Sequence, residues 1–408
     1  MNIVLLHFSS PPVVGGVENV MVHHARLMAG AGHHVSIVAG RGAPIDDRVR
    51  FVSLPRCDSL HPEVLAVKAE LDRGQVTARF HHLKEAIATE LTAVLAGCDL
   101  VILHNVASLN KNLALTAALA DLCTRGGKPR FLLWHYDLAW SPARSQITLH
   151  AGYPWALLRT AWPNATHVTI SAERRRELAQ LFGLDDASIR VIPPGVEARL
   201  LFKWEPWTAE LVETLHLWDA NPLLLLPARL TPRKNIGLAL AVLAELRRLL
   251  PHAMLLVTGP AGPHNMANVQ YKESLLALRT ELQLQGAAHF LVERTNTYVP
   301  DAVIADLYRM ADALILPSLE EGFGIPLLEA GLARLPVFCT DLPVLHEVGG
   351  DDATYFAPSA SPAAIADLIA QRLQQEPVAR LAARVRHAYL WEPLYAAQIA
   401  PLLEEVVR

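Results

Sequence analysis

The sequence predicts an α/β protein built from two doubly wound domains. Short apolar runs alternate with longer stretches of helical periodicity along the whole chain, which is typical of parallel sheets covered by helices. The 408 residues are too many for one ordinary core and suit two domains. Prolines and a glycine interrupt the pattern at residues 192–207. We therefore expect one domain over 1–195 and a second over 196–385.

The apolar runs predict the strands in order. In the first half they span 2–8, 34–40, 50–54, 99–105, 130–136, 167–171 and 189–193. In the second half they span 222–228, 253–259, 288–293, 313–318, 336–340 and 354–356. Helical spacing between the first two runs places Val20, Met21 and His24 on one face, and Gly30 and Gly32 end that helix.

Composition excludes several classes of protein. The net charge of −4 is too small to indicate binding to nucleic acid. No apolar run is long enough to cross a bilayer, and the start of the chain has no basic region but carries His7, unlike a signal peptide. The four cysteines are scattered without a CxxC pair. We expect reduced, buried thiols in a cytoplasmic protein.

Polar residues and glycines follow many of the predicted strands. In open α/β sheets the ligand crevice lies beyond the carboxyl ends of the strands, so these positions are candidates for a binding site. In the first domain they are Gly15, Gly16, His104, Asn105, His135, Tyr136, Asp137 and Ser171. In the second domain they are Arg229 to Lys234, the residues from Gly259 onward, Glu293, Arg294 and the stretch 317–330. Their placement predicts a cleft between the two domains.

The first strand–loop–helix unit lacks the G-x-G-x-x-G pattern of dinucleotide-binding folds. Gly15 and Gly16 stand immediately before a helix, where backbone N–H groups can approach an anion. A flexible turn is the alternative interpretation of the same glycines.

Two cations follow the strand at 222–228. Arg229 and Lys234 lie in a loop before a helix, where the helix dipole disfavours positive charge and an anionic ligand would offset the cost. Arginine suits bidentate contacts to phosphate and lysine acts as a point charge. Arg233 could take the place of either residue. Exposed loop cations are otherwise commonly solvated.

The stretch 317–330, PSLEEGFGIPLLEA, places acids and glycines beside an apolar run. Pro326 suits the first turn of a helix, which puts Glu321 in the loop and Glu329 about one turn inside. The glycines at 322 and 324 let the backbone approach a ligand closely. Carboxylates accept from hydroxyl groups, so the stretch suits a sugar or a ribose. Alternatively, Glu321 and Glu329 are first-turn acids that stabilise the helix dipole, with Glu320 a solvated neighbour.

Here the sequence resembles a known family. Glu321 and Glu329, separated by seven residues that include Gly-Phe-Gly, are similar to the signature of the retaining glycosyltransferases of family 4. PARLTPRKNI (227–236) resembles that family's Arg-x4-Lys segment, and GGVE (15–18) its amino-terminal glycine loop. Two further segments, SAERRREL (171–178) and VIPPGVE (191–197), resemble the family's usual sequence from the end of the first domain into the linker. The resemblance implies GT-B architecture, two Rossmann-like domains facing a deep cleft, with a last helix at about 386–408 that returns to the first domain.

The resemblance also implies a nucleotide-sugar site. Donor-binding residues would be Gly16, Arg229, Lys234, Glu293, Arg294, Glu321, Gly322, Phe323, Gly324 and Glu329. Residues in catalysis would be His135, Arg229, Lys234 and Glu321. The cations would hold the diphosphate, Glu329 the ribose and Glu321 the transferred sugar. His135 would lie near that sugar, and Glu293 with Arg294 near the base.

The acceptor is expected mainly on the first domain, at Gly15, His104, Asn105, Tyr136, Asp137 and Ser171. Residues 135–164, with three tryptophans, would shape its pocket or form an aromatic plug under a long loop. Ala228 and Asn235 stand where the family commonly has glycine, and the loop from residue 258 is longer than usual.

We therefore expect a retaining hexosyltransferase that needs no metal and no cofactor besides its nucleotide-sugar donor. Its acceptor would be a small molecule, a saccharide or a lipid, and the last is compatible with peripheral membrane contact. The adjacent histidine pairs do not have the spacing of metal ligands. The alternatives are a nucleotide-sugar epimerase of the same fold and a non-catalytic sugar-nucleotide-binding protein.

Overall fold

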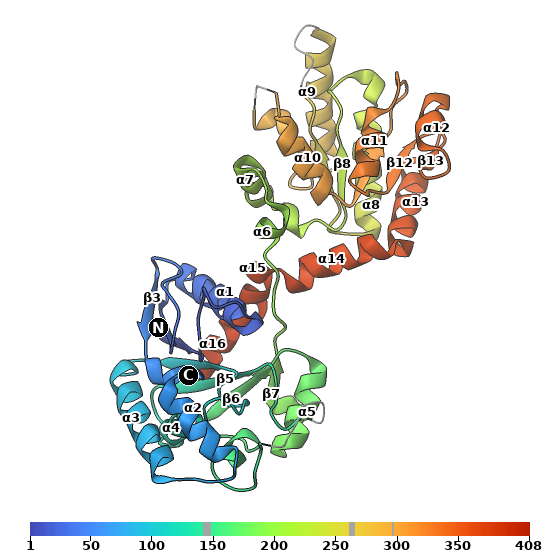
Figure 1. Cartoon of the computed structure of the whole chain (residues 1–408). Coiled ribbons are helices and arrows are strands. Elements are labelled where there is room, and N and C mark those ends of the chain that lie inside the picture. Colours follow the sequence, from blue (N-terminus) through green and yellow to red (C-terminus); the bar gives the residue numbers. More distant parts are fainter. Residues whose placement is uncertain (142–147, 261–265, 296–297) are drawn as a thin grey trace. The chain divides into compact units, whose positions relative to one another are not determined.

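The chain folds into two α/β units, which Figure 1 shows in the colours of the sequence. The computed structural model describes residues 1–141, 148–260, 266–295 and 298–408. Unit 1 comprises Met1–Val196 and Trp391–Arg408, and unit 2 comprises Glu197–Leu390. The returning segment thus begins at Trp391 rather than at residue 386. The difference arises because Arg386 is buried in unit 2, where it forms an ion pair with Asp312.

Unit 1 contains a seven-stranded parallel sheet of order β3-β2-β1-β4-β5-β6-β7. Its strands are Asn2–Leu6 (β1), His34–Ala39 (β2), Val49–Ser53 (β3), Leu100–His104 (β4), Arg130–His135 (β5), Ala165–Thr169 (β6) and Ile189–Val191 (β7). Its α-helices are Gly16–Gly30 (α1), Pro62–Leu71 (α2), Ala78–Val94 (α3), Leu113–Thr124 (α4), Ala172–Phe182 (α5), Trp391–Leu394 (α15) and Ala400–Val407 (α16). A π-helical stretch, Tyr395–Ile399, joins the last two.

Alternate residues of the unit 1 strands pack on opposite faces of the sheet. Val4 and Leu6 lie in the core beneath α2, α3 and α4. Ile3 and Leu5 pack with α1 and the segment that begins at Trp391. A Cβ at Gly195 would lie 2.5 Å from a ring atom of Trp391, so the chain leaves unit 1 directly against this ring. Only glycine allows that approach.

Unit 2 contains a six-stranded parallel sheet of order β10-β9-β8-β11-β12-β13. Its strands are Leu223–Leu226 (β8), Met254–Val257 (β9), Ala288–Phe290 (β10), Ala313–Leu316 (β11), Val337–Thr340 (β12) and Thr354–Phe356 (β13). Its α-helices are Ala198–Phe202 (α6), Pro206–Thr214 (α7), Ile236–Leu249 (α8), Met266–Glu281 (α9), Asp301–Met310 (α10), Ile325–Leu332 (α11), Pro343–Gly349 (α12), Pro362–Gln375 (α13) and Pro377–Tyr389 (α14).

The central strands of unit 2 are buried on both faces. Every residue of β8 and β11 is buried, as expected for continuous apolar strands in a parallel sheet. Leu224 and Leu226 pack with α8 and α13, whereas Leu223 and Leu225 pack with α7, α10 and α11. The predicted strands therefore all occur, and both units have the doubly wound α/β class that the sequence predicts.

Candidate functional site

In the sheet of unit 2, the order in which successive strands are added changes direction between β8 and β11. The strands β8 and β11 are neighbours, and the strand order runs away from them on both sides. In open α/β sheets a ligand binds outside the carboxyl ends of the strands at such a switch point. The loop after β8 carries Arg229 and Lys234, and the loop after β11 carries Glu321. The fold thus brings together three residues that the sequence singled out.

The loop that carries Arg229 packs closely against the loop after β9. The N–H of Leu230 donates to the carbonyl of Pro260 at 3.2 Å. A Cβ on Gly259 would lie 1.9 Å from the backbone oxygen of Ala228, so only glycine fits there. Arg229 itself is exposed, and among the described residues no carboxylate pairs with its guanidinium group. Its charge is available to an anion.

Lys234 and Glu321 form a hydrogen-bonded ion pair between the two loops, through Lys234 Nζ and Glu321 Oε1. Their side chains are only 12% and 6% exposed. Lys234 ends a 3-10 turn, Pro232–Lys234 (η5), and Asn235 in the left-handed region (φ 49°) precedes α8. Ser318 Oγ donates to the same carboxylate oxygen at 2.7 Å.

The loop after β11 turns into α11 through Gly324. This residue has a φ of 101°, a conformation that favours glycine, and a Cβ there would lie 2.7 Å from Leu345 Cδ2. By contrast, a Cβ on Gly322 would contact nothing within 4 Å. The side chain of Phe323 is largely exposed, so a contact through its backbone is compatible with the structure.

Glu329 lies inside α11, and its Oε2 accepts a hydrogen bond from the hydroxyl of Tyr308 at 2.5 Å. Glu321 precedes α11, and no acidic residue lies in the first turn of that helix. The interpretation of Glu321 and Glu329 as first-turn acids is therefore wrong. Glu320 is exposed, as expected of a solvated neighbour.

Glu293 and Arg294 follow β10. Both oxygens of the Glu293 carboxylate accept from Arg279, at 2.6 and 2.8 Å, so this side chain is already paired. Arg294 is exposed. A contact of Glu293 with a base would therefore involve its backbone.

In unit 1 the switch point lies between β1 and β4. Gly15 is the N-cap residue of α1 and Gly16 its first residue. Gly16 is exposed, and a Cβ there would meet nothing within 4 Å. Glu18, in the first turn, accepts a hydrogen bond at 2.7 Å from Ser9 Oγ in the loop after β1.

The remaining acceptor candidates divide into buried and accessible residues. His104 is fully buried, and its Nδ1 lies 2.9 Å from the Tyr136 hydroxyl. The side-chain oxygen of Asn105 accepts from the backbone N–H groups of Tyr136 and Asp137 at 3.2 and 3.1 Å. Ser171 is the N-cap of α5. His104, Asn105 and Tyr136 thus fix the loops, whereas Asp137 and Ser171 retain exposed surface.

His135, expected near the transferred sugar, is buried in the structure. Its side chain is 0% exposed, and its Nε2 lies 3.1 Å from His167 Nδ1. The imidazole lies on the face of the sheet covered by α5, where it contacts Phe182 edge-on. Burial, followed by the charge of His167, holds the pKa of His135 well below its ordinary value. Of the segment 135–164, which was expected to shape the acceptor pocket, residues 142–147 lie outside the described part.

The sequence analysis did not identify three polar side chains that lie next to acidic residues of the candidate sites, namely Ser318, Tyr308 and His7. Ser318 donates a hydrogen bond to Glu321, and Tyr308 donates one to Glu329. In the sequence they appear only as a serine shortly after a predicted strand and a tyrosine on the helix before that strand. His7 lies 3.7 Å from Glu18 through Nε2, and its Nδ1 donates to the carbonyl of His104 at 2.6 Å. Its position directly after the first strand could have identified it.

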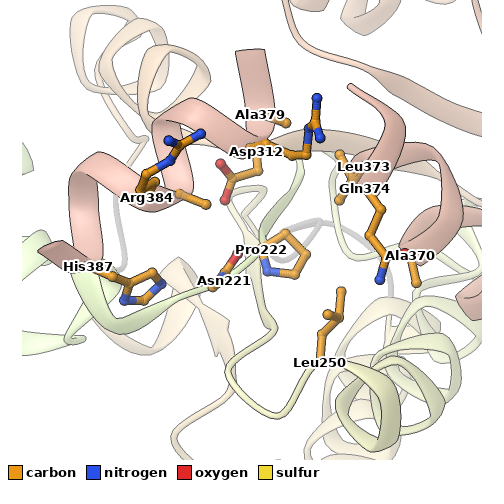
Figure 2. Close-up of a pocket in the computed structure, with 12 residues that line it drawn as sticks. Asn221, Pro222, Leu250, Asp312, Ala370, Leu373, Gln374, Ala379, Arg384 and His387 are labelled. Carbon is orange, nitrogen blue, oxygen red and sulfur yellow. The ribbon is translucent and has the colours of Figure 1, made fainter. Parts of the chain in front are cut away.

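A cavity of about 330 Å³ lies at the amino ends of β8 and β11. Figure 2 shows Asp312 and Pro222 beside it, with Arg384 and His387 of α14 at its side. This end of the sheet is opposite to the switch point, so the cavity does not belong to the candidate donor site.

The part of the chain that the structure describes contains no group of three or more His, Cys, Asp or Glu residues placed to hold a metal ion. Within the same ranges, no helix combines the length and the apolarity that a membrane span requires. The four cysteines are buried and unpaired, as their spacing predicts.

Two parallel, doubly wound units in one chain, with cations and carboxylates at a switch point, define a GT-B-type fold. Residues 14–200 match the model of Glycosyltransferase Family 4, and residues 213–388 match that of Glycosyl transferases group 1. The chain belongs to this glycosyltransferase family.

Relatives in the family differ in what they act on. The D-inositol 3-phosphate glycosyltransferase of Nocardia farcinica is 30% identical over 191 residues, 46% of this chain and 40% of its own length. The MMP alpha-(1->4)-mannosyltransferase of Mycolicibacterium hassiacum is 24% identical over 86% of this chain and 84% of its own. The chain thus spans half or less of the length of the D-inositol 3-phosphate glycosyltransferases that it matches. The structure of Anabaena HepE in complex with UDP aligns over 99% of this chain and all of its own, at 17% identity and a TM-score of 0.36, a likeness too weak to carry a functional conclusion.

Proposed function

We propose that the chain transfers a hexose from a nucleoside-diphosphate sugar to an acceptor hydroxyl, with retention of the anomeric configuration and without a metal ion. The observation that carries the proposal is the meeting of Arg229, Lys234 and Glu321 at the switch point of unit 2. Two cations for a diphosphate and a carboxylate for sugar hydroxyls are the groups that such a donor needs.

Arg229 and Lys234 would bind the diphosphate and stabilise the negative charge that develops on the leaving group. Glu321 would accept from hydroxyls of the transferred sugar, and Glu329 from the ribose. Phe323 and Gly324 would contribute backbone groups. The acceptor would bind on unit 1, near Gly15, Gly16, Asp137 and Ser171, and closure around the donor would exclude water.

Glu321 supports retention by a front-face route better than by double displacement. Its carboxylate is held by Lys234 and Ser318, which suits a positioning role more than nucleophilic attack. In the front-face route the bond between the anomeric carbon and the phosphate oxygen breaks as the acceptor oxygen bonds to the same face. The departing phosphate takes the acceptor proton.

Binding of UDP, GDP and ADP to the purified full chain, measured by calorimetry in buffer with EDTA, tests the donor site. One nucleotide should bind at micromolar affinity or better, and Arg229→Ala or Lys234→Ala should weaken it at least tenfold. Arg233→Ala is the matched control, because Arg233 is an exposed cation in the same loop. Normal binding by both Arg229→Ala and Lys234→Ala would refute the phosphate assignment.

Product analysis separates transfer from the alternatives. An α-linked donor should give an α-linked product in the anomeric proton spectrum, and only when an acceptor is present. A new nucleotide sugar formed without acceptor would indicate an epimerase. Saturable donor binding without turnover across donors would indicate a non-catalytic protein.

A further inference from the structure

Two acidic side chains of the candidate donor site, Glu321 and Glu329, are each held by a buried hydroxyl group through one oxygen of the carboxylate. Ser318 Oγ donates to Glu321 Oε1 at 2.7 Å, and the Tyr308 hydroxyl donates to Glu329 Oε2 at 2.5 Å. Both donors are almost completely buried, Ser318 at 1% and Tyr308 at 4% exposure. The two hydroxyls come from different elements, the loop after β11 and helix α10.

The second oxygen of each carboxylate remains available. Among the residues that the structure describes, neither Glu321 Oε2 nor Glu329 Oε1 has a hydrogen-bond partner. Since an ionised carboxylate can accept several hydrogen bonds, one oxygen can be fixed while the other binds a ligand.

From this arrangement we infer that Ser318 and Tyr308 are positioning residues: they orient the Glu321 and Glu329 carboxylates so that one oxygen of each can accept from a donor hydroxyl. The inference rests on the proposed function and names two residues of its site that were not assigned a role. Fixing a carboxylate before the ligand arrives reduces the rotamer entropy that binding would otherwise cost.

Lys234 alone does not orient Glu321. An ammonium group is a point charge on a flexible stem, so it attracts the carboxylate without fixing its plane. Ser318 has a short side chain at a buried position two residues after β11, which restricts the place of its hydroxyl. The Ser318 hydroxyl therefore supplies the direction that the ion pair lacks.

Tyr308 donates a proton that it retains at any working pH. Burial, followed by the hydrogen bond to Glu329 and the charge of that carboxylate, raises the pKa of the Tyr308 phenol well above its ordinary value. A neutral phenol bound to a carboxylate is a charge-assisted hydrogen bond, which is stronger than one between neutral groups.

The test uses four single-site variants of the full chain, each assayed for binding of UDP, GDP and ADP and for turnover of the glucose and mannose derivatives of the nucleotide that binds best. Tyr308→Phe should weaken nucleotide binding about tenfold with little change in kcat, because Glu329 contacts the ribose. Ser318→Ala should lower kcat about tenfold with little change in nucleotide affinity, because Glu321 contacts the sugar. Tyr355→Phe and Ser274→Ala are matched controls, since these hydroxyls donate to backbone carbonyls elsewhere in unit 2.

Double variants distinguish positioning from a general effect on the domain. Tyr308→Phe combined with Glu329→Gln should bind nucleotide no more weakly than Glu329→Gln alone, and Ser318→Ala with Glu321→Gln should turn over no more slowly than Glu321→Gln alone. Ser318→Thr, which keeps the hydroxyl, should restore part of the lost kcat. Additive effects, or equal losses of binding and turnover in both single variants, would overturn the inference.

The result also separates this inference from the proposed function. If Glu321→Gln and Glu329→Gln leave binding and turnover unchanged, the donor site itself is wrong. If these two variants have their effects while Ser318→Ala and Tyr308→Phe behave like the controls, only the positioning roles fail. Ser318→Ala and Tyr308→Phe each remove only a hydroxyl oxygen. Thermal unfolding of every variant shows whether the fold is kept.

Discussion

Lys234 and Glu321 are each other's partner at the switch point of unit 2, and this pairing has consequences for donor binding. Both side chains are largely shielded from water, where a charge is stabilised chiefly by its partner. A diphosphate that binds Lys234 brings negative charge close to Glu321. The carboxylate that is expected to hold the sugar therefore opposes the binding of the nucleotide without its sugar.

Glu321→Gln should raise the affinity for the nucleoside diphosphate by roughly fivefold, which corresponds to about 1 kcal/mol, and should lower turnover. Glutamine keeps the size and an acceptor oxygen for Ser318 but removes the repulsive charge. Calorimetry with the nucleotide and steady-state kinetics with its sugar derivative measure the two effects.

Glu320→Gln is the control for this change. It removes the same charge one residue away, from an exposed side chain, and should alter neither binding nor turnover. A lower nucleotide affinity in Glu321→Gln would contradict the expected repulsion.

At the scale of elements, the packing of two loops fixes the place of Arg229. Gly259 after β9 lies directly against the backbone of Ala228 and Arg229, with a space too small for a Cβ. Gly259→Ala should displace the loop after β8 and weaken nucleotide binding about tenfold, without removing any charged group. Binding calorimetry measures the loss. Gly331→Ala, at a position in α11 where a Cβ meets nothing within 4 Å, should bind nucleotide normally, and equal effects of both changes would contradict this account.

Helix α14 is held to unit 2 by a buried ion pair. Arg386 Nη2 donates to both carboxylate oxygens of Asp312, and Oδ2 also accepts from the N–H of Leu223 at 2.7 Å. Arg386→Ala leaves the Asp312 carboxylate buried without its cation, so unit 2 should lose about 3 kcal/mol of its free energy of unfolding.

Arg384→Ala is the matched control for the ion pair. Arg384 is an exposed residue of the same helix beside the cavity of Figure 2, and its removal should change stability by less than about 0.5 kcal/mol. The two variants are compared by denaturant unfolding, with cleavage of α14 by a protease as the signal for unfolding. Equal stability would mean that the pair does not hold the helix.

At the scale of the whole molecule, buried neutral histidines predict sensitivity to acid. Burial lowers the pKa of His7 to about 4, of His24 to about 3 and of His167 to about 4, all in unit 1. In unit 2, burial followed by nearby arginines lowers the pKa of His289 to about 4.

The sign of this dependence follows from proton binding. The unfolded chain protonates these histidines near pH 6.5, whereas the folded chain does so only near pH 3 to 4. The contribution of these histidines to the free energy of unfolding is therefore fully present above pH 6.5. It is lost as the pH falls from 6.5 toward the folded-state pKa values of about 3 to about 4. Each histidine contributes up to about 1.4 kcal/mol per pH unit.

Denaturant unfolding at several values from pH 7 to pH 4.5 should show unit 1 losing stability faster than unit 2. The fluorescence of Trp134 and Trp391, which contact His24, reports on unit 1. His24→Leu should flatten this dependence, since neither ring nitrogen of His24 has a hydrogen-bond partner among the described residues. An unchanged slope in that variant would refute the assignment.

Several of the predicted site residues lie at the carboxyl ends of strands in unit 2, and local patterns were enough to select them. Arg229, Lys234, Glu321 and Glu329 were selected from short segments, because a strand end followed by charged residues is visible in the sequence. His135 was selected in the same way, yet its imidazole lies on the covered face of the sheet. A strand end indicates the edge of the sheet but leaves open whether a side chain remains exposed there.

By itself the sequence determined the elements and the class of fold. Buried parallel strands read as continuous apolar runs, and helices as amphipathic periods, so all strands of both units were predicted from local pattern. It also determined which charged residues stand at strand ends. Only the tertiary structure decided the order of the strands, and with it that the loops after β8 and β11 are neighbours. Strand order depends on the pairing of residues far apart in the chain, such as Leu225 of β8 with Leu314 of β11, and no local pattern encodes it.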